Sequence, residues 1–277
     1  EGLIERCVPL DAKACDEKHL SLVHHAEYLK IAKQDTQSGK NSLSTGDTQI
    51  CEGSWGVSLR ATGGLINAID EIFSGRIERA FSLSRPPGHH ATPSKGMGFC
   101  LFNHIAIAAR YAQEKYKVGK VLIVDWDVHH GNGTQDTFYE DESVFFFSTH
   151  QSPWYPGTGT SDEKGRGKAL GTTLNVPLPA GSGREEVVEG AFGQDLANKI
   201  ESYRPELILI SAGFDSRAND PLGQFTLSDQ DFFDLTTMLM RTAKECCNGH
   251  LVSVLEGGYN LDGLARACTS HLRALTA

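Results

Sequence analysis

The 277-residue sequence has no apolar run long enough to cross a bilayer and no signal-peptide pattern at its start. It also lacks an excess of basic residues, because 26 Lys and Arg stand against 35 Asp and Glu and give a net charge of −9. That charge argues against a broad basic surface for nucleic acid, although it is compatible with the basic tail of a protein substrate. The sequence therefore predicts no membrane partner and no direct nucleic-acid partner.

No cysteine pattern is present either. The seven cysteines, an odd number, are scattered without a C-x-x-C spacing or a disulfide framework. Such usage is typical of proteins in a reducing compartment. We therefore expect an intracellular protein, cytoplasmic or, if the source is eukaryotic, nuclear; the oligomeric state is not indicated.

The order of the predicted elements indicates an α/β fold. The chain is long enough for one large core, and no repeat or linker divides it. Strands alternate with helices, which predicts a single domain, residues 1–277, with a central, mostly parallel β-sheet and helices on both faces. The strands are expected over 79–84, 120–125, 143–148, 174–176, 207–211 and 251–255. The helices are expected over 20–32, 54–73, 103–116, 184–203, 228–246 and 263–275. His24 and His25, in the first helix, are interpreted as surface or satisfied core residues.

One predicted strand leads directly into a polar cluster. Residues 121–124 are apolar, as in a strand buried on both faces, and Asp125, Asp127 and His129 follow at alternate positions. Alternate residues of an extended chain share a face, so these side chains would point the same way. Carboxylate and imidazole donors at this spacing can hold one Zn²⁺ and keep a coordination position for water. The alternative is a strand followed by a polar turn.

Three other predicted strands also end in chemically active residues. His89 and His90 follow one strand, Asp215 the second and Tyr259 the third. Ligands bind beyond the carboxyl ends of the strands in such sheets, so these residues should converge with the first cluster. Asp215 would complete three metal ligands, the histidines would supply a proton acceptor, and Tyr259 would donate to a developing oxyanion.

Six sequence blocks carry a family resemblance: Arg85-Pro-Pro-Gly-His89-His90-Ala, Gly98-Phe99-Cys100-Leu-Phe-Asn103-His, Asp125-Trp-Asp127-Val-His129-His-Gly-Asn132-Gly, Pro156-Gly-Thr-Gly, Ala-Gly-Phe-Asp215 and Glu-Gly-Gly-Tyr259. In these blocks and in their order the chain resembles the zinc-dependent histone deacetylase family, class II type, over nearly its whole length. The resemblance implies an arginase-like α/β fold. It also implies one catalytic Zn²⁺ and hydrolysis of acetyl-lysine, or another acylated amine, to a free amine and a carboxylate.

The resemblance also assigns roles by position. Asp127, His129 and Asp215 would bind zinc, His90 would be the general base, and His89 its electrostatic or acid partner.

Two further residues would tune the histidines. Asp125 would hydrogen-bond His89, and Asn132 would contact His90. Since Asn132 is an amide rather than a carboxylate, His90 should be the less basic imidazole, suited to take a proton and pass it to the leaving amine.

The resemblance further implies a tunnel around the lysine methylenes and structural K⁺. The tunnel and its rim would be formed by Gly98, Phe99, Tyr155, Leu222 and Gly258, and Asp47 would bind the substrate backbone. The potassium positions would be Asp125, Asp127, His129, Ser148 and Thr149 near the zinc site, and Phe138, Asp141 and Val144 further away. An apolar tunnel favours the neutral amide over a charged free lysine.

The chain departs from the family pattern at its start. The family usually begins with a strand and a loop rich in His and Pro, whereas this chain opens at Glu1-Gly2-Leu3, in the position of the first helix. Loss of that strand would expose a sheet edge and one tunnel wall. Some class II relatives that resemble this chain have His at the position of Tyr259 and are poorly active, so Tyr259 predicts real deacetylase activity. A polyamine specialist would need an acidic residue at the tunnel wall for its cationic substrate, and Leu222 at that position argues against one.

Three alternatives remain open. An arginase-like ureohydrolase would need two Mn²⁺ and more Asp ligands. A catalytically weak module could retain zinc and bind acyl-lysine without turnover. A deacetylase of small acylated amines would have the same sequence features as one that acts on proteins.

Overall fold

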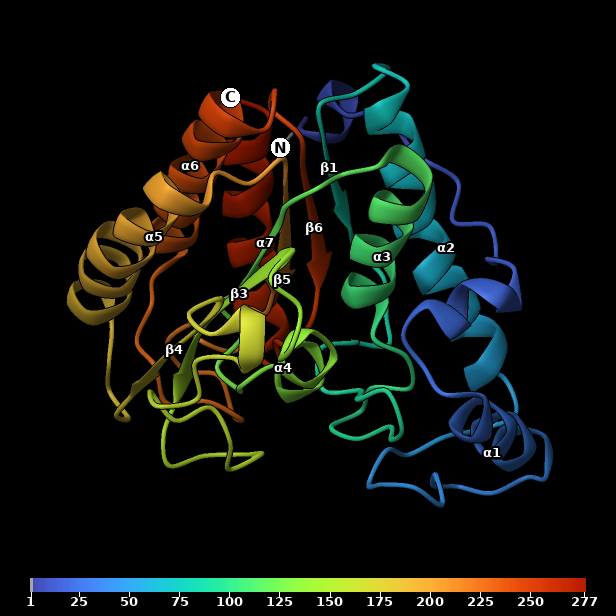
Figure 1. Ribbon diagram of the computed structural model, residues 1–277. Helices are drawn as coiled ribbons and strands as arrows, with labels where there is room; N and C mark the ends of the chain where they lie inside the picture. The colour runs from blue at the N-terminus through green and yellow to red at the C-terminus, as the bar shows by residue number, and fades with distance from the viewer. Residues whose placement is uncertain (1) are drawn as a thin grey trace.

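Six parallel strands form one sheet in the order β1-β6-β5-β2-β3-β4 in the computed structural model, which describes residues 2–277 (Figure 1). The strands are β1 Arg79–Ser82, β2 Val121–Asp125, β3 Val144–Gln151, β4 Thr173–Leu178, β5 Leu207–Ala212 and β6 Leu251–Leu255. Every neighbouring pair is parallel, so all six carboxyl ends lie at the same edge. The predicted α/β fold is confirmed, and β1 and β4 are the edge strands of this sheet.

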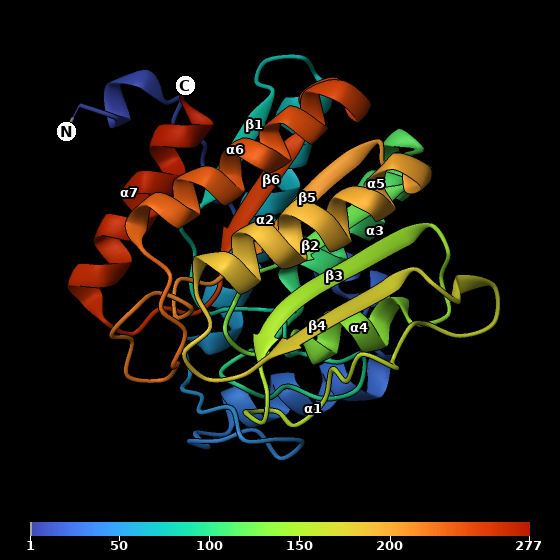
Figure 2. The same ribbon diagram turned by 90° about the vertical axis from the view of Figure 1, so that its left-hand side faces the viewer.

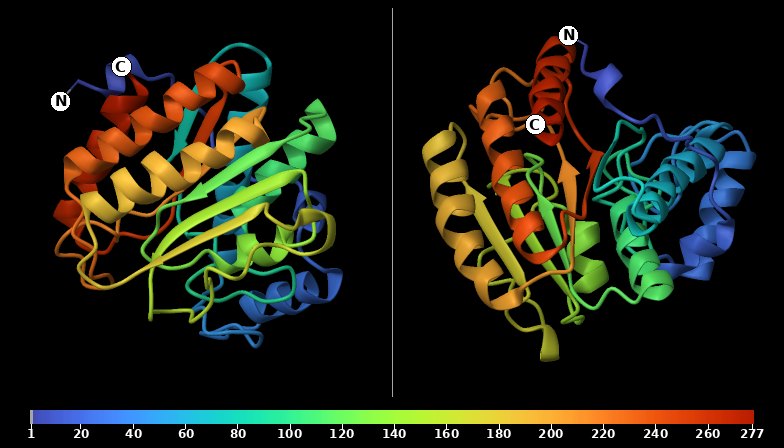
Figure 3. Two further views of the ribbon diagram at one scale, coloured as in Figure 1. Left: turned by 60° about the vertical axis from the view of Figure 1, so that its left-hand side comes forward. Right: turned by 90° about the horizontal axis from the view of Figure 1, so that it is seen from above.

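Helices cover both faces of the sheet (Figures 2 and 3). One face carries α1 Ala26–Gln37, α2 Ser54–Phe73 and α3 His104–Tyr116; the other carries α5 Ala197–Tyr203, α6 Asp229–Cys246 and α7 Leu261–Leu275. None of the helices within residues 2–277 is long and apolar enough to span a membrane.

The strand sequence explains this layering. Val121 and Ile123 of β2 pack into the core under α2 and α3, whereas Leu122 and Val124 pack into the second core. Both sets are fully buried, as expected for a parallel strand that has helices on each side. The alternation continues past the strand, where Trp126 lies in the second core. The polar residues at alternate positions are thereby directed to the carboxyl edge.

The predicted helix over 20–32 is wrong as a continuous element. A 3₁₀ helix, Glu17–Leu22, is separated by a break from α1, which begins at Ala26. The break buries the His24 ring, whose Nδ1 donates to the Thr92 carbonyl at 3.0 Å and whose Nε2 accepts from the Asn103 N–H at 2.9 Å. These tertiary contacts outweigh local helical periodicity. His24 is thus a satisfied core residue, and His25 is exposed, as predicted.

Other boundaries also differ from the prediction. A seven-residue helix, α4 Asn132–Phe138, was not expected because its first turn contains glycine, which disfavours helix. The predicted helix over 184–203 is a π-helical segment, Glu185–Leu196, that continues as α5. The chain does not open inside the first helix: Ile4–Arg6 form one 3₁₀ turn and the backbone is extended at Cys7. Glu1 lies outside the described residues.

Candidate functional site

Three metal-type donors converge at the carboxyl edge of the sheet. Asp127 and His129 follow β2 and Asp215 follows β5, the neighbouring strand, and one donor atom from each lies within 4.8 Å of the others. His129 Nδ1 is 3.0 Å from Asp127 Oδ1 and 3.2 Å from Asp215 Oδ2. Zinc binds oxygen and nitrogen donors at about 2.0–2.2 Å, which separates tetrahedral donors by about 3.4 Å. The three donors therefore fit a single ion with little rearrangement.

The electrostatics of this group also suit a cation. Asp215 Oδ2 is buried and accepts no hydrogen bond, and its partner oxygen accepts from the Val128 N–H at 2.9 Å. Burial opposes protonation of His129, but the carboxylates of Asp127 and Asp215 beside its ring outweigh it and raise the pKa of His129 to about 10. The two carboxylates thus favour a positive charge where the donors converge, and a metal ion there would compete with a proton for the same donors.

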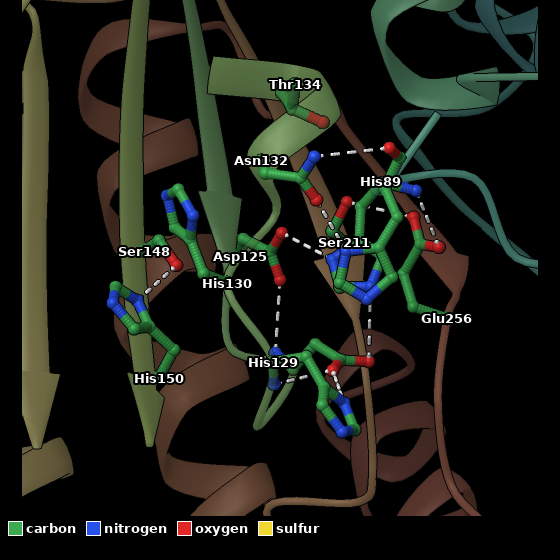
Figure 4. Close-up of polar contacts among 12 residues, drawn as sticks. His89, Asp125, His129, His130, Asn132, Thr134, Ser148, His150, Ser211 and Glu256 are labelled. Atoms are coloured by element: carbon green, nitrogen blue, oxygen red, sulfur yellow. Dashed lines mark hydrogen bonds and ion pairs between the residues drawn. The ribbon is translucent and has the colours of Figure 1, made fainter. Parts of the chain in front are cut away.

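His89 and His90 lie beside these donors with their rings 4.0 Å apart. Nδ1 of His89 donates to Asp125 Oδ2 at 2.9 Å (Figure 4). Nδ1 of His90 donates to Asn132 Oδ1 at 2.8 Å. Burial opposes protonation of His89, yet the carboxylate of Asp125 and that of Asp127 raise its pKa well above the usual value. Burial and the neighbouring His89 hold the pKa of His90 well below its usual value. The two adjacent imidazoles therefore differ in basicity, and His89 is the more easily protonated of the pair.

A narrow cavity leads from the surface to this group. Its lining is Pro87, His89, His90, Gly98, Phe99, His129, Tyr155, Gly257 and Tyr259. Phe99 and Tyr155 are 48% and 37% exposed, so they stand at the mouth, whereas the histidines are buried. Gly98 has a φ of +56°, and a Cβ there would lie 2.3 Å from the His90 ring. Only glycine allows the wall to approach the imidazole this closely.

Tyr259 lies on the same cavity and is held through its backbone. Its N–H donates to Asp220 Oδ2 at 2.7 Å, and the same oxygen accepts from Asn260 N at 3.1 Å. The Tyr259 ring is 6.1 Å from that of Phe99, between centroids, and burial raises the pKa of the phenol. The phenol therefore stays protonated and able to donate a hydrogen bond.

The predicted substrate contacts divide into two groups. Gly98, Phe99 and Tyr155 line the cavity, whereas Asp47, Leu222 and Gly258 do not belong to its lining. Asp47 instead lies at the rim and accepts from the Gly98 N–H at 2.8 Å and from the Tyr155 hydroxyl at 3.0 Å.

The other two lie outside the lining for different reasons. Leu222 is 39% exposed, and its carbonyl accepts from the Trp154 indole at 2.9 Å, so this loop supports the rim. Gly258 turns the chain with a φ of +132°, and a Cβ there would lie 2.8 Å from Leu264. This turn brings Tyr259 to the cavity.

The residues expected near potassium lie at two places, and all of them except the partly exposed Asp141 are buried. Ser148 pairs with Asp125 across β2 and β3, and its hydroxyl lies 3.0 Å from His150 Nδ1. The Thr149 hydroxyl has no hydrogen-bond partner within residues 2–277. The Phe138 carbonyl accepts from the Asp141 N–H at 3.0 Å. The Asp141 carbonyl accepts from the Val144 N–H at 3.4 Å. Potassium at either place stays a prediction.

Two buried carboxylates at the site were given no role from the sequence. Asp220 holds Tyr259, and no local pattern marks it, because it lies in a loop between β5 and α6. Glu256 directly follows the apolar strand β6, much as Asp125 ends β2. This position at the carboxyl end of a buried strand is the sequence feature that could have identified Glu256 as a residue of the site.

Comparison with known proteins agrees with this geometry. Residues 1–275 match the model of the histone deacetylase domain. The chain is 40% identical over 265 residues to "Histone deacetylase 10, chloroplastic" of Oryza sativa subsp. japonica, covering 92% of this chain and 60% of the relative. It is 42% identical over 273 residues to "Histone deacetylase 14, chloroplastic" of Arabidopsis thaliana, covering 95% and 64%. The chain thus spans less than two thirds of either relative.

A solved structure gives the same result. The crystal structure of the HDA15 HD domain superimposes with a TM-score of 0.91 at 37% identity, covering 98% of this chain and 75% of that one. The chain therefore belongs to the histone deacetylase family, of class II type.

Proposed function

We propose that the chain hydrolyses the amide of an acylated amine, acetyl-lysine in a peptide or a related compound, and that the ion held by Asp127, His129 and Asp215 is zinc. The observation that carries the proposal is the pairing of His89 and His90, with opposite pKa shifts, in a narrow cavity that is also lined by the metal donor His129. Opposed pKa values in adjacent titratable groups are typical of acid–base sites.

The donor set favours one ion over two. Within residues 2–277, Asp127, His129 and Asp215 are the one group of three or more His, Cys, Asp or Glu side chains with converging donor atoms. A two-manganese ureohydrolase would need further carboxylates around a second ion. Two carboxylates, one imidazole and an open position also match the composition of catalytic zinc sites.

Each protein group then has a defined task. A bound zinc ion would supply a Lewis acid that polarises the amide carbonyl and acidifies water. His90, the less basic ring, would accept the proton of the attacking water, and His89, the more basic ring, would stabilise the negative charge beside it. Tyr259 would donate its hydroxyl to the developing oxyanion. His90 would return its proton to the amine nitrogen as the C–N bond breaks, leaving a carboxylic acid and an amine.

The cavity mouth favours an unbranched apolar segment next to the amide. Phe99 and Tyr155 present aromatic surface at the entrance, which would contact lysine methylenes, whereas a free ammonium group would be desolvated at a cost. A small acylated diamine has the same alkyl segment. The cavity would therefore accept both kinds of substrate, and only contacts outside its mouth could distinguish a peptide from a small molecule.

The test is a substrate panel with the zinc-loaded chain. We would measure release of acetate from an acetyl-lysine peptide and from a monoacetylated diamine, and release of urea from arginine. Acetate release that exceeds the uncatalysed rate supports the proposal, and the faster of the two substrates identifies the class. Urea release, or stoichiometric peptide binding without acetate release, would contradict it.

A further inference from the structure

Glu256 is a buried carboxylate that has no task in the proposed reaction. It directly follows β6 and has no exposed surface. Its Oε2 accepts from the Gly88 N–H at 2.6 Å and from the His89 N–H at 3.2 Å, and its Oε1 accepts from the Ser211 hydroxyl at 3.0 Å. Figure 4 shows Glu256 between His89 and Ser211. A buried charge is unfavourable unless it is paired or hydrogen-bonded, and these three donors meet that requirement.

The contacts join three segments that are distant in sequence. β6 lies between β1 and β5, so Glu256 reaches the loop after β1 on one side and Ser211 of β5 on the other. Its own N–H donates to the Ala212 carbonyl at 3.1 Å. The carboxylate therefore fixes the loop that carries the histidine pair to the two strands beside it.

The next residue ties the same turn to the metal donors. Gly257 N–H donates to Asp127 Oδ2 at 2.8 Å, and a Cβ at Gly257 would lie 2.0 Å from Asp215 Oδ2. Glu256 thus binds the loop that carries the histidine pair, and the next residue, Gly257, binds the donor group, so a single turn of the chain connects the two. An apolar residue at 256 would leave the N–H groups of Gly88 and His89 without this acceptor.

We propose that Glu256 is a positioning residue that sets the backbone of the His89–His90 pair relative to Asp127 and Asp215, and thereby the geometry of proton transfer. The proposal rests on the proposed function, since it concerns the reaction of that site. Proton transfer requires heavy-atom distances of about 2.6–3.2 Å. A displacement of about 1 Å can lower the rate of an oriented reaction by about 10²-fold.

The experiment compares four variants of the zinc-loaded chain at matched zinc content. Glu256→Ala removes both acceptors. Glu256→Gln keeps one acceptor oxygen for the N–H groups of Gly88 and His89, and its amide N–H can donate to the Ser211 oxygen. Ser211→Ala removes one donor. Asp231→Asn is the control, because Asp231 is also a buried carboxylate but caps α6 through Ser228. Each is assayed for kcat and KM on an acetyl-lysine peptide and on an aryl acetate, whose phenolate leaves without protonation.

Glu256→Ala should lower kcat on the peptide by about 10–100-fold, with KM within about twofold because Phe99 and Tyr155 are untouched. The loss on the aryl acetate should be several-fold smaller, and Glu256→Gln should recover most of the peptide activity. Ser211→Ala should lie between these variants, and Asp231→Asn should match the wild type. Wild-type kcat in Glu256→Ala, or equal losses on both substrates, would overturn the proposal.

An independent readout separates this proposal from the proposed function. Imidazole nitrogen NMR should show shifted signals for His89 and His90 in Glu256→Ala, while His24 and His271 keep theirs. Unchanged His89 and His90 signals would refute a positioning role, whether or not the wild type hydrolyses either substrate. Shifted signals in a chain without acetate release would support positioning and refute the hydrolase function.

Discussion

His90 and Asn132 are joined by a hydrogen bond of 2.8 Å from Nδ1 to the side-chain amide oxygen, whereas the adjacent His89 has a carboxylate partner, Asp125, at 2.9 Å. An amide partner fixes the ring without favouring the imidazolium form as strongly as a carboxylate does. This difference allows the two neighbouring rings, 4.0 Å apart, to hold different charges at neutral pH.

Asn132→Asp should make His90 more basic, as Asp125 does for His89. A carboxylate at this distance raises the pKa of His90, so more of it is protonated at neutral pH and unable to accept a proton. The acid limb of the kcat/KM profile should therefore move upward by about one pH unit or more. The profile is measured with zinc content checked at each pH. An acid limb at the wild-type position would show that His90 is not the group that must be neutral.

The two cavity tyrosines should respond differently to loss of their hydroxyls. Tyr259→Phe removes the proposed oxyanion donor, and kcat should fall by about 10²–10³-fold with little change in KM. Steady-state kinetics on an acetyl-lysine peptide tests this. Unaltered kcat in Tyr259→Phe would remove the phenol from the reaction.

Tyr155→Phe is the matched variant at the cavity mouth. It loses the 3.0 Å hydrogen bond to Asp47, a contact that orders the rim and not the reacting atoms. A neutral hydrogen bond contributes about 0.5–1.5 kcal/mol, so KM should rise by about two- to tenfold while kcat is preserved. A fall in kcat comparable with that of Tyr259→Phe would place Tyr155 in the reaction instead.

Metal binding should stabilise the folded chain through Asp215. After chelation, added Zn²⁺ should raise the midpoint of thermal unfolding, because the ion binds the converging donors of the folded state. Asp215→Asn should abolish this rise. Asp220→Asn is the matched control: Asp220 is buried in the same loop but binds the backbone of Tyr259, so the zinc-dependent rise should persist. A rise that survives in Asp215→Asn would place the ion elsewhere.

His24 should make the chain sensitive to acid. Burial lowers its pKa to about 3, against an ordinary value of 6.5. Below pH 6.5 the unfolded chain binds a proton that the folded chain does not, so the free energy of unfolding decreases as pH falls toward 3. The slope for this group is about 1.4 kcal/mol per pH unit.

The matched pair for this test is His24 and its exposed neighbour. Urea unfolding of the metal-free protein at pH 6 and pH 5 should show a decrease in the free energy of unfolding that is smaller by about 1 kcal/mol in His24→Gln than in the wild type. His25→Gln should keep the wild-type decrease, since solvent reaches that ring in the folded state. Equal decreases in all three proteins would show that His24 is protonated in the fold.

The sheet and the metal donors could be predicted because both follow from short-range rules. Apolar runs identify buried strands, parallel strands end at one edge, and alternation directs Asp127 and His129 into the space that Asp215 enters from β5. The histidine pair follows from the same rule applied to β1. These features depend on residue order and strand direction, which the sequence contains directly.

Other features depend on contacts between distant segments. The helix break at His24 is explained only by Thr92 and Asn103, which lie about 70 residues or more along the chain. Asp220 is positioned by the Tyr259 loop, and Asp47 meets Tyr155 across the cavity mouth. Local propensity carries no information about such pairs, so the backbone contacts of Asp220 were not expected.

The most direct measurement is turnover of an acetyl-lysine peptide by wild type and His90→Ala, with zinc counted in the same samples. His90 is not a member of the donor group, so the variant should retain one zinc per chain. Its acetate release should fall by about 10²–10⁴-fold because the other ring of the pair, His89, is made more basic by Asp125 and Asp127 and is less suited to accept the proton. Wild-type turnover in a zinc-loaded His90→Ala would contradict the account.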